Sequence, residues 1–120
     1  MIPMLTKSFP ALATVAGYLI VRAAGDGVDV ATGNADPLIA VGDSMGADAG
    51  SMLDATLSGI AEVRAGGTFS FGDLLTADAE GRAIKAEPVA GILVRTIGVA
   101  HADADEGDIA PVHVSPGAIG

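Results

Sequence analysis

An acidic stretch near the C-terminus has the side-chain spacing that comes closest to a ligand-binding arrangement. Asp103, Asp105 and Asp108 surround Gly107, and alternate carboxylates can converge on one hard cation such as Ca²⁺. The stretch lacks the distal bidentate Glu and the flanking helices of a helix–loop–helix calcium site. The sequence therefore favours an acidic hairpin turn, and calcium binding by residues 103–108 stays open as the alternative.

The other residues that could do chemistry do not form a catalytic pattern. His101 and His113 are not at ligand spacing, and a zinc site would need two more ligands that nothing else in the sequence suggests. Gly66-Gly67 lacks the lysine and the strand–helix context of a phosphate loop, and no serine is expected to act as a nucleophile. We therefore predict no catalytic residue, no metal and no cofactor, and we do not expect an enzyme.

The elements that position these residues belong to one small domain. The chain has 120 residues, of which half are apolar, but it has only three Phe, one Tyr and no Trp. Small apolar side chains each remove little area from water, at about 25 cal/mol per Å². We therefore expect a thin core and a stability that depends partly on association. The absence of Cys excludes a disulfide framework.

The charge balance excludes some partners. Fifteen acidic residues against six basic ones give a formal net charge of −9. A nucleic-acid binder neutralises phosphates with Lys and Arg, and anionic membranes repel an acidic protein, so neither partner is predicted. The apolar run over residues 11–21 is too short to span a membrane and lacks most features of a signal peptide. A secreted or surface-exposed small β-domain with a binding role remains an alternative.

The pattern of apolar and turn residues predicts about eight or nine short strands with frequent turns, which is typical of an all-β barrel or sandwich. The 17 Gly residues also favour turns over helices. The predicted strands cover residues 18–23, 28–31, 38–41, 52–57, 60–64, 74–76, 82–86, 92–100 and 109–114.

Three local predictions concern the second half of the chain. Phe69 and Phe71 are two positions apart and are expected to point to one face. Pro111 cannot donate to a strand ladder, so the last strand is expected at an edge. His113 is predicted to share a strand face with Ile109 and Pro111, and residues 115–120 are expected to form a tail.

An N-terminal arm is predicted over residues 1–17, followed by a single β-rich domain over residues 18–120. Pro3 and Pro10 prevent a continuous helix, and the apolar residues of the arm show no clean period. An apolar terminal segment either packs on its own domain or docks on a partner. The residues expected to contact a shell or a neighbour are Met4, Leu5, Lys7, Phe9 and Leu12.

A weak internal repeat is visible. Residues 39–41 are followed by an Ala/Asp loop, a Gly and a strand, and residues 97–99 are followed by the same series. The two copies start about 58 positions apart, from Ile39 to Ile97. Two copies are too few for a solenoid, which needs about three. The pattern instead predicts two related hairpins placed across a small barrel or sandwich.

The order of these segments resembles the tailed-bacteriophage capsid decoration, or cement, proteins over nearly the whole chain. The most specific pieces are the Ala-Gly-Gly corner (65–67), the run Gly-Asp-x-Leu-Thr-Ala-Asp-x-x-Gly-Arg-Ala (72–83) and a closing Gly-Asp-Ile (107–109). The resembling segments are LTKSF (5–9), YLIVRAAGDG (18–27), PLIAVGDSMG (37–46), SGIAEVRAGGTFSFGDLLTADAEGRAIKA (58–86) and RTIGVAHADADEGDIAPVHVSPG (95–117).

The resemblance implies a mainly β, single-domain barrel or sandwich (β-tulip-like) with an extended arm and little helix. It also implies a structural protein of the virion that binds the major capsid protein on the outer surface of an expanded head, after synthesis in the host cytoplasm. Homotrimers at three-fold and quasi-three-fold positions are expected. No catalytic residue carries over from the family, and the sequence leaves open any further ligand such as a glycan.

A less favoured alternative is a carrier or small enzyme domain. Residues 72–75 and 83–86 faintly resemble the hairpin of biotinyl and lipoyl carrier domains, in which a lysine is modified, and Lys85 would be that lysine. In carrier domains the lysine hairpin precedes the Gly-Asp turn, whereas here the order is reversed. An unmodified hairpin lysine is therefore the better interpretation.

Overall fold

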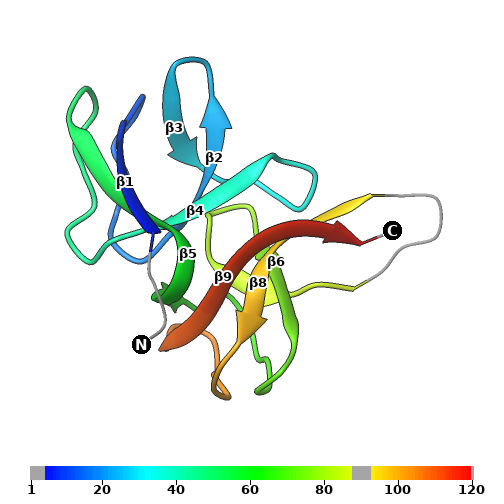
Figure 1. Ribbon diagram of the computed structural model, residues 1–120. Helices are drawn as coiled ribbons and strands as arrows, with labels where there is room; N and C mark the ends of the chain where they lie inside the picture. Colours follow the sequence, from blue (N-terminus) through cyan, green and yellow to red (C-terminus); the bar gives the residue numbers. More distant parts are fainter. Residues whose placement is uncertain (1–4, 88–92, 120) are drawn as a thin grey trace.

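The computed structural model describes residues 5–87 and 93–119, and in those residues it contains one nine-stranded sheet and no helix (Figure 1). All named strand pairs are antiparallel, in the order β3-β2-β4-β5-β9-β8-β6-β7, with β1 beside β5. The mainly β, single-domain fold predicted from the sequence is confirmed. The strands are β1 Leu5–Pro10, β2 Ile20–Ala24, β3 Gly27–Val30, β4 Leu38–Gly42, β5 Met52–Arg64, β6 Leu74–Ala77, β7 Ala83–Lys85, β8 Val94–Ala100 and β9 Ile109–Ile119.

The strand β5 joins two segments that the sequence predicts as separate strands. Residues 52–57 and 60–64 form one strand of 13 residues, and its first part pairs with β1 and β4 while its second part pairs with β9. Gly59 lies at the change of partner and has φ 108, a conformation that favours glycine. The sequence predicted that one strand ends at residue 57 and another begins at residue 60, but here Gly59 allows the strand to bend and continue.

The strand β9 lies inside the sheet, between β5 and β8, so the predicted edge position is wrong. Pro111 lies opposite Glu62, and its carbonyl oxygen accepts a hydrogen bond from the His101 N–H, at 3.0 Å. His101 follows the last residue of β8, so the N–H that proline lacks is missing only at the end of that ladder. The predicted tail is also wrong in part, because residues 115–119 continue β9 along β8.

The two phenylalanines do not share a face. Phe69 is 2% exposed and Phe71 is 69% exposed. The prediction assumed a regular strand, but residues 66–73 make only a single bridge there, from Phe69 to Ala104, before the chain turns at Gly72. Alternation of side chains holds only within a regular strand, so it fails across this turn.

Residues 5–17 pack on the sheet, which is the first of the two possibilities expected for an apolar terminal segment. All six residues of β1 pair with β5, from Leu5 opposite Ser58 to Pro10 opposite Met52. Ala11 and Val15 follow and are 1% and 2% exposed. Ala11 and Val15 are therefore part of the first-half core, and deleting the whole segment would remove these core side chains.

The structure extends the weak sequence repeat to most of the chain. We call residues 5–58 the first half and residues 59–119 the second half. The β4–β5 and β8–β9 hairpins correspond, as do the β2–β3 and β6–β7 hairpins. Each half also contains one parallel and one antiparallel isolated β-bridge at corresponding positions. The parallel bridges are Ala11–Val28 and Ala65–Ala83, and the antiparallel bridges are Val15–Ala47 and Phe69–Ala104.

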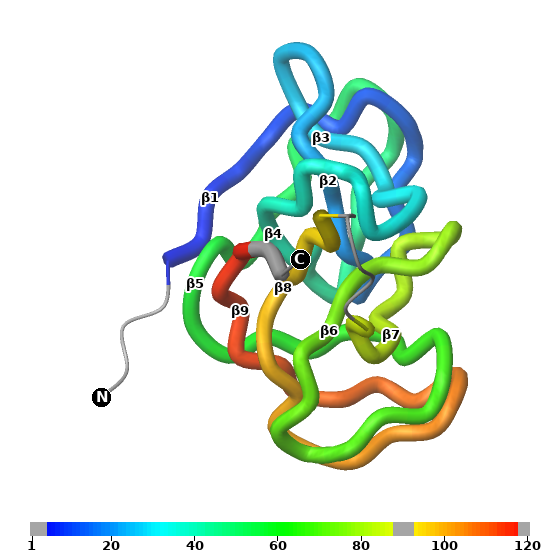
Figure 2. Tube along the Cα trace, turned by 90° about the vertical axis from the view of Figure 1, so that its right-hand side faces the viewer, coloured from blue at the N-terminus to red at the C-terminus, as the bar shows by residue number. Residues whose placement is uncertain are grey.

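Backbone hydrogen bonds follow the same correspondence. The Val15 and Ala47 backbones bond to each other in both directions, at 2.8 and 2.9 Å, and so do those of Phe69 and Ala104, both at 3.0 Å. The two loops over residues 66–73 and 101–108 run side by side in Figure 2, joined by the second of these pairs. The predicted related hairpins are therefore part of a fold-level duplication.

Each half has its own apolar core, and the halves also pack on each other. The first-half core contains Ala11, Val15, Val21, Val28, Ala40, Leu53 and Ala55. The larger cluster contains the corresponding second-half residues Ala65, Phe69, Leu75, Ala83, Ala110 and Val112, together with Ile20, Leu38 and Val41 from the first half. The backbone joins the halves as well, because the Ile20 N–H donates to the Gly81 carbonyl oxygen at 2.8 Å.

Candidate interaction surface

The predicted contact residues on β1 and after it have different environments. Leu5 and Leu12 are exposed, at 56% and 51%. Phe9 is half-buried against the first-half core, and the Lys7 Nζ lies 5.4 Å from the centre of its ring. Met4 lies outside the described residues. Leu5, Lys7 and Leu12 are therefore exposed to a partner, and the two leucines are the apolar members of this exposed group.

The outer edge of β1 has features that discourage pairing with another strand. The strand has six residues, its register shifts between Leu5 and Thr6, and it ends at Pro10, which has no N–H to donate. It also has the exposed Lys7. Short length, irregular register, lysine and proline are the usual protections of an edge strand. The β1 edge is therefore a poor site for strand addition.

A row of partly exposed side chains crosses four strands on the solvent side of the second half. Ile60 on β5 lies opposite His113 on β9, His113 lies opposite Val99 on β8, and Val99 lies opposite Leu74 on β6. Direct partners point to the same side of a sheet. The opposite side is the core, where the neighbouring Val112 is fully buried. The row therefore faces away from the core of its own half.

Aromatic rings extend this row toward the loop at residues 66–73. The centres of the Phe71 and His101 rings are 5.8 Å apart, and those of the His101 and His113 rings are 5.9 Å apart. Leu74 is 38% exposed, and Phe71 more so. We call this surface the outer face; its residues are Ile60, Phe71, Leu74, Val99, His101 and His113. None of the six is Asp, Glu, Lys or Arg, which is uncommon in a chain with a net charge of −9.

The matching row of the first half is covered at two of its four positions, while Thr6 is exposed and Thr56 is half-buried. Thr6 lies opposite Thr56, Thr56 opposite Val41, and Val41 opposite Ile20. Ile20 and Val41 are 0% and 1% exposed, because they pack into the larger cluster with second-half residues. Equivalent apolar positions are therefore buried in the first half and open to solvent in the second half.

The prediction that His113 shares a strand face with Ile109 and Pro111 is confirmed, because all three are half-buried. His113 and Pro111 are both half-buried on the solvent side of β9, while Val112 and Val114 are buried on the other side. No group of three or more His, Cys, Asp or Glu residues that could hold a metal occurs within residues 5–87 and 93–119. The sequence did not reveal the row itself, because its residues come from four strands that only the fold brings together.

Carboxylates of the two neighbouring loops, residues 66–73 and 101–108, accept hydrogen bonds from backbone N–H groups. Asp103 accepts from the Phe71 N–H at 2.8 Å, Asp108 accepts from the Asp105 N–H at 3.0 Å, and Asp73 accepts from the Ser70 N–H at 2.9 Å. Side chains that cap turns in this way hold loop geometry. This arrangement fits the acidic turn that the sequence favoured, with its carboxylates directed at different loop positions.

Asp78 and Arg82 fix the corner at residues 65–67. The Arg82 Nε donates to Asp78 at 2.9 Å, and Glu80 and Glu106 lie 3.6 Å from the guanidinium. The negative charge of Asp78 is the main cause that raises the pKa of Arg82, so this arginine keeps its charge. A Cβ on Gly66 would overlap the Asp78 carboxylate, which explains the glycine at this corner.

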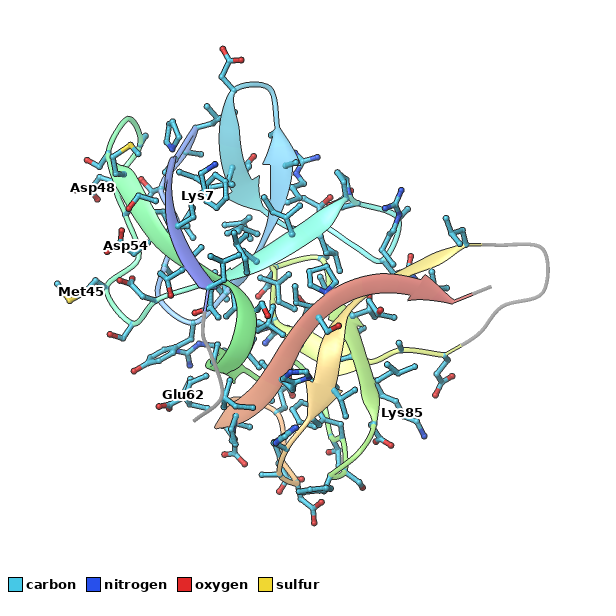
Figure 3. All side chains as sticks on the ribbon, in the orientation of Figure 1. Lys7, Met45, Asp48, Asp54, Glu62 and Lys85 are labelled. Atoms are coloured by element: carbon cyan, nitrogen blue, oxygen red, sulfur yellow. The ribbon has the colours of Figure 1, made fainter. Side chains whose placement is uncertain are left out.

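Two shallow hollows among the described residues correspond through the repeat. One is lined by Thr14, Val15, Ala16, Met45, Gly46, Ala47 and Asp48. Its counterpart is lined by Thr68, Phe69, Ser70, Asp103, Ala104, Asp105 and Asp108. The exposed Met45 and Asp48 lie together at one side of the molecule in Figure 3. The first hollow therefore has one carboxylate where the second has three.

Another hollow lies where the two halves meet. Its lining includes Tyr18, Ser44, Ile60 and Glu62. Ser44 is the centre of a Gly-x-Ser-x-Gly pattern over residues 42–46 that the sequence prediction did not take into account. The pattern lies between the strands β4 and β5, not between a strand and a helix, and no histidine lines the hollow. Among the described residues that line this hollow, Ser44 has the carboxylates Asp43 and Glu62 but no imidazole beside it.

Lys85 lies exposed at the end of β7, away from the other labelled residues in Figure 3. In residues 5–87 and 93–119 there is no helix long and apolar enough to cross a membrane.

The fold is similar to a solved structure, the head fiber gp8.5 N base in bacteriophage phi29. The TM-score is 0.66, the sequence identity is 20%, and the match covers 94% of this chain and 95% of that chain. At this identity the likeness shows the fold alone. No protein-family model matches the chain, and no curated protein matches it.

Proposed function

We propose that this chain is a structural protein of a bacteriophage virion that binds the outside of the expanded head and stabilises the shell. The observation that carries this proposal is the fold shared with a head fiber base over nearly the whole of both chains. The sequence resemblance to capsid decoration proteins supports the same function independently. A net charge of −9 suits a virion surface that must not bind released DNA.

The proposed partner is the major capsid protein, and the proposed location is the outer surface of the virion. A protein that binds the expanded shell and not its precursor stabilises the expanded form by mass action, and many copies add their contributions. No chemical step is required. Homotrimers at three-fold and quasi-three-fold positions complete the proposal, since closed symmetry is the rule for such assemblies.

We further propose that the N-terminal residues contact the shell. Leu5 and Leu12 support this because they are large apolar side chains open to solvent. Phe9 would position them through its packing against the first-half core, with Lys7 above its ring. Met4 completes the proposed set from the sequence alone. A deletion that stops at residue 4 leaves β1 intact and therefore tests contact without removing the core.

The test is binding of the purified chain to expanded heads that lack it, measured by co-sedimentation. We expect saturable binding to heads, and a shift to higher temperature in the release of packaged DNA. The double change Leu5→Ser and Leu12→Ser should weaken binding about tenfold or more, which corresponds to about 1.4 kcal/mol. Leu93→Ser is the matched control, because Leu93 is equally exposed (56%) and lies in the second half. Absence of head binding by the unaltered chain would overturn the proposal.

A further inference from the structure

We infer that copies of this chain associate with one another through the outer face of the second half. This inference deepens the proposed function, because it rests on the proposal that the chain self-associates. The outer face is the set Ile60, Phe71, Leu74, Val99, His101 and His113 defined above, and the occupant is a second copy of the chain. Its basis is the internal duplication together with the charge of the surface.

The duplication shows what covers this kind of face. At the matching positions of the first half, Ile20 and Val41 are buried by the second half of the same chain. The contact is close, since the Ile20 N–H bonds the Gly81 carbonyl oxygen at 2.8 Å and a Cβ on Gly81 would lie 2.6 Å from Val30. Within one chain, the second half therefore already covers this face of the first half.

The second half presents the same positions without a cover from the described residues. Leu74, the counterpart of Ile20, is 38% exposed, and Val99, the counterpart of Val41, is half-buried. Aromatic and imidazole rings enlarge the surface at Phe71 and His101. A contiguous apolar patch of this kind usually marks an interaction site. A second copy supplies a half of the same fold to cover it.

Charge favours a second copy at this face over other surfaces of the chain. Two chains of −9 repel each other wherever their acidic loops approach. The row from Ile60 to Leu74 contains no Asp or Glu; Asp73 and Asp103 are engaged by backbone N–H groups of the adjacent loop. Contact here buries apolar area at the lowest electrostatic cost, and added salt should strengthen it by screening the remaining repulsion.

The test is sedimentation velocity of the full chain over a range of protein concentrations, at low and high salt and without heads. We expect association that tightens with salt. Leu74→Glu and Phe71→Glu should each weaken it about tenfold or more. Met45→Glu is the matched control, since Met45 is 86% exposed, lies in the first half and receives the same change. Far-UV circular dichroism and thermal midpoints close to those of the unaltered chain show that the variants are folded.

Two results would overturn the inference. One is a monomer for the unaltered chain at every concentration and salt, both in solution and by cross-linking on heads. The other is a Met45→Glu effect equal to or larger than those of Leu74→Glu and Phe71→Glu. Head binding is measured separately with the same variants. A chain that binds heads as a monomer refutes the inference alone, and a chain that associates through the outer face but never binds heads refutes only the proposed function.

Discussion

The two halves of this chain have the same backbone plan but different surroundings. Both contain a long hairpin, a short hairpin and the same pair of isolated bridges. In the first half, Ile20 and Val41 on β2 and β4 pack into the larger cluster with the second half, while their neighbours Val21 and Ala40 pack into the first-half core. In the second half, Leu74 and Val99 take the positions of Ile20 and Val41, and they are 38% exposed and half-buried.

This difference shows how a duplication can create a binding surface. When two equivalent units pack in tandem, one unit uses its face within the chain and the other leaves the same face available. The side chains have diverged accordingly. Thr6 and Thr56 stand where the second half has Ile60 and His113. The exposed positions of the second half have therefore become more apolar and more aromatic than their partners.

The largest expected difference is in the free energy of unfolding lost when equivalent residues of the two cores are truncated. Val15 and Phe69 occupy equivalent, buried positions at equivalent bridges. Phe69→Ala should lower the free energy of unfolding by about 3–5 kcal/mol, because it leaves a large cavity in the larger cluster. Val15→Ala removes fewer atoms and should cost clearly less. Urea denaturation of both variants checks this, and equal losses would contradict the assignment of the larger cluster as the dominant core.

A second comparison tests the backbone equivalence itself. Gly50 and Gly107 have φ 84 and 91, and no atom lies within 4 Å of a Cβ built on either. Ala at these positions should cost about 1 kcal/mol through backbone strain alone, and the two costs should agree. Gly33 also has open space but no positive φ, so Gly33→Ala should be neutral or slightly stabilising. Unequal costs for the two strained glycines would argue against the equivalence.

The smallest expected effect on stability comes from protonation of a turn carboxylate in the first half, Asp36. Burial acts to raise the pKa of Asp36, but hydrogen bonds from the Thr32 N–H and hydroxyl, at 2.6 and 2.7 Å, and the charge of Arg22 lower it overall. A carboxylate with a lowered folded pKa stabilises the fold above its ordinary value of 3.8, and this contribution is lost as the pH falls through the folded pKa.

Asp36→Asn should therefore lower stability by about 1 kcal/mol at neutral pH, and the difference from the unaltered chain should shrink below pH 3.8. Thermal unfolding as a function of pH measures this. A difference for Asp36→Asn that stays constant with pH would show that its effect is structural and not electrostatic.

Much of the fold could be predicted because strand residues alternate in burial. In β5, Val63 is buried between the exposed Glu62 and Arg64, as the sequence pattern predicts. The predictions failed where a residue type or spacing was assumed always to indicate the same local structure. Pro111 was placed at an edge although only one bond of its ladder is affected, and Phe69 and Phe71 were given a regular strand that a turn interrupts.

The candidate surface could not be predicted in the same way. The contact residues expected on β1 follow from local apolar character, and Leu5 and Leu12 are indeed exposed. The outer face depends on Ile60, Leu74, Val99 and His113, which are far apart along the chain and become neighbours only through the strand register. No periodicity within one segment contains that information.

By itself the sequence determined the class of fold, the turns and the chemistry available, because these depend on local backbone preferences and on side-chain types. It also contained the repeat in faint form, in the two hairpins that begin near Ile39 and Ile97. Only the tertiary structure decided which copy of the repeated face is covered. Ile20 and Leu74 are both apolar strand residues, and what separates them is the packing of the second half against the first.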